Sequence, residues 1–214
     1  MSRVLRLDEM NEKLNYWEDE YSKNAIPLYP SQFAAFVASE LYDDETQIID
    51  VGCGNGRDSI FFAQLGRHVI GIDGSSVVVD TNNKRFQKQS KSVHFIEQNM
   101  NDEDVIDYEL PENSTIYSRF FIHAIDENAE NNFLRMAQNN MQTGQRLFLE
   151  FRTEQDANLV KVAKEHYRRY VNNEAFIANL EKHDYIVNYI VEGFGYAKYK
   201  TEDAHVCRII CQKK

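Results

Sequence analysis

The chain has 214 residues, and its 24 lysines and arginines against 34 aspartates and glutamates leave a formal net charge of -10. This balance argues against a protein that binds nucleic acid or an anionic membrane, because both select a basic surface. No run of about 18 apolar residues could span a membrane. An anionic small molecule stays open as a substrate, but it would need a local cluster of arginines.

The length suits a single α/β domain, and no linker or repeat divides the chain. Three cysteines, an odd number, and an N-terminus without an apolar signal-peptide stretch are typical of a reducing cytosol. We therefore expect a cytoplasmic protein. No metal site is expected, because the sequence has no H-E-x-x-H motif and no Cys/His array. The oligomeric state is left open; a homodimer is compatible with the sequence.

The first 44 residues predict a helical cap on a core that spans residues 45–214. Residues 8–23 form a polar helical pattern in which Trp17 and Tyr21 share one face, and Pro27 and Pro30 end it. Ser31 then predicts the N-cap of a second helix. Trp17 and Tyr21 are interpreted either as part of a lid or as the apolar side of an ordinary covering helix.

From residue 47 onward, short apolar runs alternate with helical segments. The pattern predicts strands at 47–51, 68–72, 93–96, 115–118 and 146–151, and helices at 58–65, 77–89, 126–141 and across most of 156–182. Two further strands, 185–192 and 204–212, follow without a helix between them. Such alternation is typical of βαβ units. The predicted fold is a doubly wound, Rossmann-like α/β fold with a seven-stranded, mostly parallel sheet and an antiparallel C-terminal edge strand.

A glycine loop is the strongest motif in the sequence. The apolar strand ending at Val51 runs into Gly52, Gly54 and Gly56 and then into a helix. Glycines there permit positive φ and let a ligand approach the backbone, at the end of the sheet where doubly wound folds bind ligands. The bland alternative is a plain strand-to-helix turn.

Acidic residues around this loop favour a cationic ligand over a pyrophosphate. Asp50 and Asp58 flank a G-x-G-x-G loop, whereas a dinucleotide fingerprint reads G-x-G-x-x-G. Asp73 ends the second strand, 21 residues after Gly52, where a carboxylate would meet ribose hydroxyls. A dehydrogenase is disfavoured by the same glycine spacing.

These motifs resemble the class I S-adenosylmethionine-dependent methyltransferases, with DVGCGNG (50–56) as the first motif and GIDGS (71–75) as the second. The resemblance implies Asp73 on the ribose and Gly52 and Gly54 against the methionine part of the cofactor. At the third motif the family has an acidic residue, where this chain has Gln98-Asn99-Met100. The implied cofactor-binding residues are Trp17, Tyr21, Pro30, Asp50, Gly52, Cys53, Gly54, Asp58, Asp73, Gly74, Ser75, Asn99, Met100 and Ser118.

Six further segments recur in a distinctive order: 17–21, 30–33, 117–123, 150–153, 166–170 and 193–210. Together they resemble methyltransferases encoded with bacterial capsule and lipopolysaccharide genes. Where that family has the sequence EDP, this chain has Glu202-Asp203-Ala204. The resemblance implies a small-molecule or glycan-precursor acceptor, anionic in character.

Methyl transfer is an in-line displacement that depends on positioning. Whether it also needs a base depends on the acceptor: an ionised carboxylate or phosphate needs none, whereas a sugar hydroxyl loses a proton and benefits from one. The predicted strand 115–118 ends beside the expected methyl group. His123 is the candidate base or acceptor-holding donor there, or else it packs under the following helix. Arg119 is predicted to hold an anionic acceptor or to pair with Asp126 or Glu127.

A cationic cluster in this acidic chain favours an anionic acceptor, because arginine forks match carboxylate and phosphate geometry. Glu150 and Arg152 are expected on one face at the end of the fifth strand. His166, Arg168 and Arg169 are predicted either to bind the acceptor or to pair with Glu165 or Glu174. Tyr196 is predicted to close over a sugar or to be a loop aromatic.

The leading hypothesis is methyl transfer from S-adenosylmethionine to an oxygen of an anionic sugar or sugar phosphate, a precursor of a surface polysaccharide. One alternative is a small-molecule O- or N-methyltransferase outside glycan metabolism. Another is a catalytically silent subunit that binds the cofactor and supports a partner enzyme.

Overall fold

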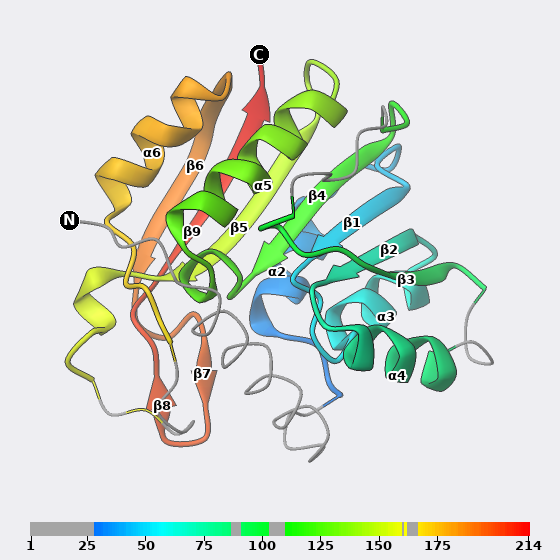
Figure 1. Ribbon diagram of the computed structural model, residues 1–214, viewed down its shortest axis with the longest axis horizontal. Coiled ribbons are helices and arrows are strands. Elements are labelled where there is room, and N and C mark those ends of the chain that lie inside the picture. Colours follow the sequence, from blue (N-terminus) through cyan, green and yellow to red (C-terminus); the bar gives the residue numbers. More distant parts are fainter. Residues whose placement is uncertain (1–27, 87–90, 103–109, 160, 162–166) are drawn as a thin grey trace.

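A computed structural model describes residues 28–86, 91–102, 110–159, 161 and 167–214 (Figure 1). The helix predicted at 8–23, with Trp17 and Tyr21, lies outside the described residues, and so does His166. None of the described helices is long and apolar enough to cross a membrane.

A seven-stranded sheet forms the centre of the fold, in the order β3-β2-β1-β4-β5-β9-β6 (Figure 1). All neighbours are parallel except β9, which runs antiparallel to both β5 and β6. The predicted doubly wound, mostly parallel seven-stranded fold is confirmed. The prediction of the C-terminal strand as the antiparallel edge is wrong in one respect: the antiparallel strand is C-terminal, but β9 lies between β5 and β6, and β6 is the edge strand. The strands are β1 (Gln47–Val51), β2 (His68–Asp73), β3 (Val93–Glu97), β4 (Ser114–Arg119), β5 (Arg146–Arg152), β6 (Tyr185–Gly193) and β9 (Val206–Lys213), with a separate hairpin of β7 (Lys198–Tyr199) and β8 (Glu202–Asp203).

Helices cover both faces of the sheet and enclose two apolar cores. One core packs α2 (Gln32–Glu40), α3 (Arg57–Gln64) and α4 (Ser76–Phe86) against one face, through side chains such as Phe33 and Phe62. The other packs α5 (Glu127–Asn140) and α6 (Asn173–Lys182) against the opposite face, through Phe133 and Leu180. This two-sided burial explains why the parallel strands read as continuous apolar runs in the sequence.

Side-chain caps set where three of these helices begin. Ser31 accepts a hydrogen bond from the amide of Ala34 at the start of α2, as predicted. Asp126 caps α5, and Asn172 caps α6. Each cap satisfies a backbone N–H that the helix itself leaves without a partner.

The prediction of helix across most of 156–182 is wrong for the described part of that segment, where the α-helix is confined to α6. Residues 167–172 are not helical, and Val171 forms a parallel bridge with Thr153. The amide of Arg169 donates to the carbonyl of His123, and that of Val171 donates to Arg152. Tertiary partners therefore take the backbone donors that a helix would have used internally.

The carboxyl ends of β1, β2, β4 and β5 meet at one edge of the sheet. The register pairs Asp50 of β1 with Gly71 of β2 and with Tyr117 of β4, and it pairs Arg119 with Glu150 of β5. The polar residues that end these strands are therefore brought together, although they lie far apart in the sequence.

Candidate active site

A cavity of about 220 Å³ opens at this edge of the sheet, between the loops that follow β1, β2, β3 and β4. The glycine loop forms one wall. Gly52 and Gly54 have φ of 75° and 52°, and a Cβ on Gly52 would lie 2.5 Å from the ring of Phe121. A side chain would not fit at Gly52, so backbone lines the cavity there. The lining residues are Asp50, Gly52, Cys53, Gly54, Asn55, Arg57, Asp58, Asp73, Gly74, Ser75, Gln98, Asn99, Met100, Asn101, Tyr117, Arg119, Phe120, Phe121, Ala124 and Ile125.

Asp73 presents a fixed carboxylate to the cavity. One of its oxygens accepts the amide of Gly54 at 2.9 Å, and the other accepts the amide of Ser75 at 3.1 Å. Burial raises the pKa of Asp73, although these backbone donors, which favour its charged form, oppose the shift. Each oxygen keeps a further lone pair with which it can accept a ligand hydroxyl.

Asp50 lies deeper, at the end of β1. Burial raises the pKa of Asp50 to about 8; the Ser59 hydroxyl, which donates to it at 2.5 Å, opposes the rise, and the charges of Asp58 and Asp73 add to it. This carboxyl group is therefore mostly protonated near pH 7. A cationic ligand beside it would favour its ionised form.

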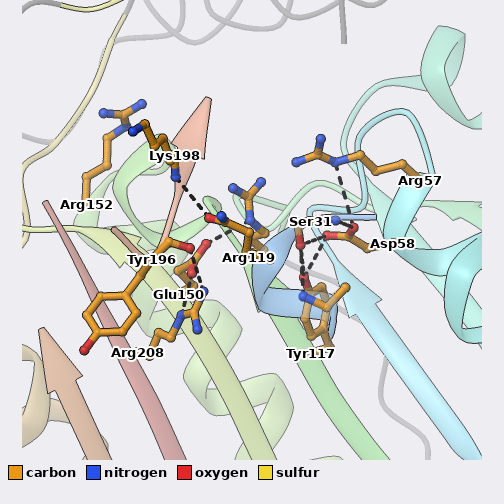
Figure 2. Close-up of polar contacts among 12 residues, drawn as sticks. Ser31, Arg57, Asp58, Tyr117, Arg119, Glu150, Arg152, Tyr196, Lys198 and Arg208 are labelled. Atoms are coloured by element: carbon orange, nitrogen blue, oxygen red, sulfur yellow. Dashed lines mark hydrogen bonds and ion pairs between the residues drawn. The ribbon is translucent and has the colours of Figure 1, made fainter. Parts of the chain in front are cut away.

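Asp58 joins three elements at the wall of the cavity (Figure 2). Its two oxygens accept the amide of Ser31 at 2.7 Å and the Ser31 hydroxyl at 2.8 Å, and the Tyr117 hydroxyl donates to it at 2.7 Å. The start of α2, the first turn of α3 and the end of β4 are thereby tied together. The sequence reasoning missed Ser31 and Tyr117 as partners of Asp58, although period-two alternation along β4 places Tyr117 on the face of Arg119.

The loop after β3 contributes Gln98, Asn99, Met100 and Asn101 to the cavity. The side-chain oxygen of Asn99 accepts the amide of Asn101 at 3.0 Å, which fixes the side chain in the position where the family has an acidic residue. Burial, reinforced by nearby Asp73, raises the pKa of the Cys53 thiol well above its ordinary value, so this cavity residue stays a neutral thiol.

Two of the residues implied at the cofactor site do not line the cavity. Ser118 is fully buried and donates to the carbonyl of Val51 at 2.9 Å, so it holds β4 against the end of β1. Pro30 is half-buried ahead of α2. Trp17 and Tyr21 lie outside the described residues.

Arg119 reaches the cavity from the end of β4, and its partner is Glu150 at 2.8 Å. Neither of the predicted alternatives, Asp126 or Glu127, takes this role; Asp126 caps α5 instead. Burial disfavours the charged guanidinium, but Glu150, Asp58 and Tyr117 together outweigh this effect and raise the pKa of Arg119. The side chain is therefore a permanent cation in the cavity wall.

Phe120, which the sequence reasoning did not single out, follows Arg119 with φ of 57°. This backbone conformation is a genuine outlier for a bulky residue, and such strain concentrates at functional sites. Its ring lies 4.0 Å from the guanidinium carbon of Arg119 and packs edge-on against His123.

His123 is buried, and the cavity lining does not include it. Its Nδ1 accepts the backbone amide of Arg152 at 3.1 Å. A neutral imidazole that accepts at Nδ1 carries its proton on Nε2 and has no second lone pair to take a proton. The geometry therefore favours the packing alternative over the candidate base.

The predicted cationic cluster is divided among internal partners instead of being gathered in the cavity. Arg152 pairs with Asp156 at 2.7 Å and with Glu202. Arg169 pairs with Glu130, and not with Glu174, one of the alternative partners that the sequence suggests. Arg168 is half-buried and outside the cavity lining.

Glu150 and Tyr196 also have internal partners. Glu150 is fully buried between Arg119 and Arg208, and the carbonyl of Tyr196 accepts from Arg208 at 2.7 Å. Of the residues predicted on the acceptor side, Arg119 alone lies in the described cavity lining. The reason is electrostatic: a buried arginine needs a carboxylate partner, and only the tertiary fold selects it.

Among the described residues, no group of three or more His, Cys, Asp and Glu side chains could hold a metal ion.

Residues 48–144 match the profile of a family described as a methyltransferase domain. No curated protein sequence matches the chain. Similar solved structures include a SAM-dependent methyltransferase from Methanosarcina mazei (TM-score 0.69, 15% identity, 83% of this chain and 96% of that one) and a TehB-like SAM-dependent methyltransferase from Corynebacterium glutamicum (0.67, 16%, 95% and 99%). A third is the glycopeptide N-methyltransferase MtfA in complex with S-adenosyl-L-methionine (0.69, 13%, 87% and 95%).

Proposed function

We propose that this protein methylates an oxygen of a small anionic acceptor, with S-adenosylmethionine as the methyl donor; the match of residues 48–144 to a methyltransferase domain supports the proposal. A sugar acid or sugar phosphate that serves as a precursor of a surface polysaccharide is the proposed acceptor class. The observation that carries the proposal is one cavity lined by Asp50 and Asp73 on the glycine-loop side and by the cation Arg119 at the end of β4.

The residues present fit the cofactor. Asp73, with both oxygens oriented by backbone amides, binds the ribose hydroxyls, and the bare backbone at Gly52 and Gly54 admits the methionine part. Asp50 faces the positive charge of the cofactor, and the Asn99–Met100 segment borders the adenine. The sulfonium of the bound cofactor supplies both the methyl group and a good leaving group.

The end of β4 positions the acceptor. Arg119 binds a negatively charged group of the acceptor, and the ring of Phe120 supports the guanidinium from its face. Each carboxyl group in the described lining already accepts a hydrogen bond from the protein: Asp50 from Ser59, Asp58 from Ser31 and Tyr117, and Asp73 from Gly54 and Ser75. Orientation and exclusion of water therefore carry the reaction, which suits an acceptor oxygen that is already ionised.

The finer acceptor class rests on the segments that resemble the polysaccharide-linked methyltransferases. The 193–199 segment with Tyr196 lies on the acceptor side, linked through Arg208 to the partner of Arg119. A small-molecule methyltransferase outside glycan metabolism and a silent cofactor-binding subunit remain the alternatives that the experiment must separate.

A direct test incubates the purified protein with S-adenosylmethionine and matched sets of sugar acids, sugar phosphates and their neutral parent sugars. We expect a mass gain of one methyl group on charged members only. Calorimetry with S-adenosylmethionine and with NAD is the control. Binding of NAD in place of S-adenosylmethionine would overturn the proposal, and cofactor binding without any methylated product would favour the silent subunit.

A further inference from the structure

A row of three charged residues crosses the sheet beside the cavity. Arg119 on β4, Glu150 on β5 and Arg208 on β9 are direct register partners, so they stand next to one another on adjacent strands. One oxygen of Glu150 accepts a hydrogen bond from Nε of Arg119 at 2.8 Å, and the other accepts one from Nε of Arg208 at 2.8 Å (Figure 2). Glu150 is fully buried, so its charge acts on both arginines with little screening by water.

This Arg119–Glu150–Arg208 row carries one positive charge in excess. Two guanidiniums share one carboxylate. The other buried arginine clusters of the described chain are balanced: Arg146 pairs with Glu45, Arg169 with Glu130, and Arg152 and Lys161 share Asp156 and Glu202. The Asp58 carboxylate also lies near Arg119, but it is paired with another cation: Nε of Arg57 lies 3.8 Å from its Oδ1. A buried excess charge is costly unless a counter-charge accompanies it.

Arg119 is the member of the row that faces the cavity. It lines the cavity, whereas Arg208 is committed to Glu150 and to the carbonyl of Tyr196, away from the lining. On Arg119, Glu150 takes the Nε donor and Phe120 contacts the flat face. Figure 2 shows the two terminal nitrogens pointing away from Glu150. The side chain is 16% exposed, so a planar pair of N–H donors is presented toward the cavity.

Building on the proposed function, we propose that this row is an anion subsite for a single negative charge, that the acceptor is a carboxylic acid bound through its carboxylate to Arg119, and that Glu150 is the positioning residue that sets the charge of the subsite. One carboxylate neutralises the row, and its two oxygens match the guanidinium fork. A phosphate monoester carries close to two charges at neutral pH. It would leave a buried excess of negative charge beside Asp58 and Asp73, and the cost of burying charge rises steeply with its magnitude.

The test measures how the row discriminates one negative charge from two. Acetate and inorganic phosphate are titrated at pH 8 and constant ionic strength into the protein saturated with S-adenosylhomocysteine. Binding is followed by the NMR signal of the Arg119 Nε–H, identified by its loss in Arg119→Lys. We expect acetate to bind in the millimolar range and more tightly than phosphate. Arg119→Lys keeps the charge but loses the fork, and acetate should bind to it about tenfold more weakly, as followed by calorimetry.

Two neighbouring substitutions should change phosphate binding in opposite directions. Glu150→Gln raises the row from one excess charge to two, so phosphate should gain at least about tenfold relative to acetate. Arg208→Gln leaves no excess charge, so both anions should bind more weakly. A merely structural role for Glu150 would leave the affinity of phosphate relative to acetate unchanged. Melting temperature and S-adenosylhomocysteine affinity of each variant show that the fold and the cofactor site persist.

The outcomes separate this proposal from the one on which it rests. Failure of S-adenosylhomocysteine to bind the unmodified protein would remove the proposed function itself. Cofactor binding with no response of Arg119 to acetate, or with tighter binding of phosphate, would overturn the anion subsite alone. Equal shifts in Glu150→Gln and Arg208→Gln would overturn the positioning role of Glu150. If Glu150→Gln does not fold, the Arg208→Gln and Arg119→Lys results still decide whether the subsite exists.

Discussion

At the scale of single residues, Asp50 is the group whose protonation state matters most to the proposed function. It ends β1 in a buried position, where its pKa of about 8 leaves the carboxyl group mostly neutral near pH 7. An unfolded chain would ionise the same group near pH 4. Asp50 therefore lowers the free energy of unfolding progressively as the pH rises between these two values. Above the higher value the loss of stability no longer increases.

We expect Asp50→Asn to stabilise the protein without cofactor in a pH-dependent way. The amide keeps an acceptor for the Ser59 hydroxyl and never ionises. The melting temperature of the variant should equal that of the unmodified protein near pH 4. The difference between the two should grow up to about pH 8 and then stay constant, with the variant higher. Thermal unfolding across this range measures the effect. A difference in melting temperature that shrinks as the pH rises would contradict the assignment.

Binding of the cofactor should shift the Asp50 carboxyl group from its neutral to its ionised form. A positive charge beside this carboxyl group favours its ionised form, so binding of S-adenosylmethionine should release protons below pH 8 and tighten as the pH rises toward 8. Calorimetry in buffers of different ionisation enthalpy counts the protons. Asp50→Asn should abolish the release; an unchanged release would place the titrating group elsewhere.

Asp73 should contribute directly to cofactor affinity. We expect Asp73→Asn to weaken S-adenosylmethionine binding about 10- to 100-fold, since a charged acceptor for hydroxyls is lost. Asp80→Asn is a matched control, because Asp80 is exposed on α4. Equal effects of the two substitutions in calorimetry would contradict the ribose assignment.

At the scale of elements, one hydroxyl joins α2 to the cavity. Ser31 caps α2 and also donates to Asp58, which in turn accepts from Tyr117 of β4. The position of α2 is thus coupled to the first turn of α3 beside the glycine loop.

We expect Ser31→Ala to lower the free energy of unfolding by about 1–2 kcal/mol and to weaken cofactor binding, because it removes both the cap and a partner of Asp58. Ser39→Ala tests the same chemistry at the other end of α2, where the exposed hydroxyl donates to the carbonyl of Phe36. It should change the free energy of unfolding by less than about 0.5 kcal/mol and leave cofactor binding unaltered. Denaturant unfolding and calorimetry measure the two effects.

At the scale of the whole molecule, the net charge of -10 and the proposed acceptor have the same sign. The fold resolves this by burying one excess positive charge at the Arg119–Glu150–Arg208 row, while Arg146, Arg152 and Arg169 pair with carboxylates elsewhere. The acidic total is a property of the chain, and the selectivity of the cavity is a property of a few residues in it.

Cofactor binding should stabilise the whole domain, because the cavity walls come from the loops after four strands. At a concentration about 100 times its dissociation constant, S-adenosylmethionine should add about 2.7 kcal/mol and raise the melting temperature by about 5–10 °C. NAD should produce no shift. A response to NAD and none to S-adenosylmethionine would contradict the cofactor assignment.

Much of the fold and half of the site could be read from local patterns. Apolar runs such as Gln47–Val51 and His68–Ile72 predict buried parallel strands, and the glycine loop with Asp73 marks the cofactor side, because all of these features are set by neighbours in the sequence. The prediction of helix across most of segment 156–182 is wrong for its described part because distant parts of the chain, and not neighbours in the sequence, decide its structure. Its helical pattern at 167–172 lost to backbone partners contributed by Arg152 and His123, which lie far away along the chain.

The acceptor side was decided by tertiary structure alone. The sequence by itself determined the alternation of strands and helices, the glycine loop and the carboxylates around it. It contained no signal that Glu150 would stand between Arg119 and Arg208, because strand register is set by the packing of the whole sheet. It likewise could not separate the arginine that faces the cavity from those neutralised inside the protein. That distinction depends on which carboxylate each guanidinium meets, and only the folded chain brings those pairs together.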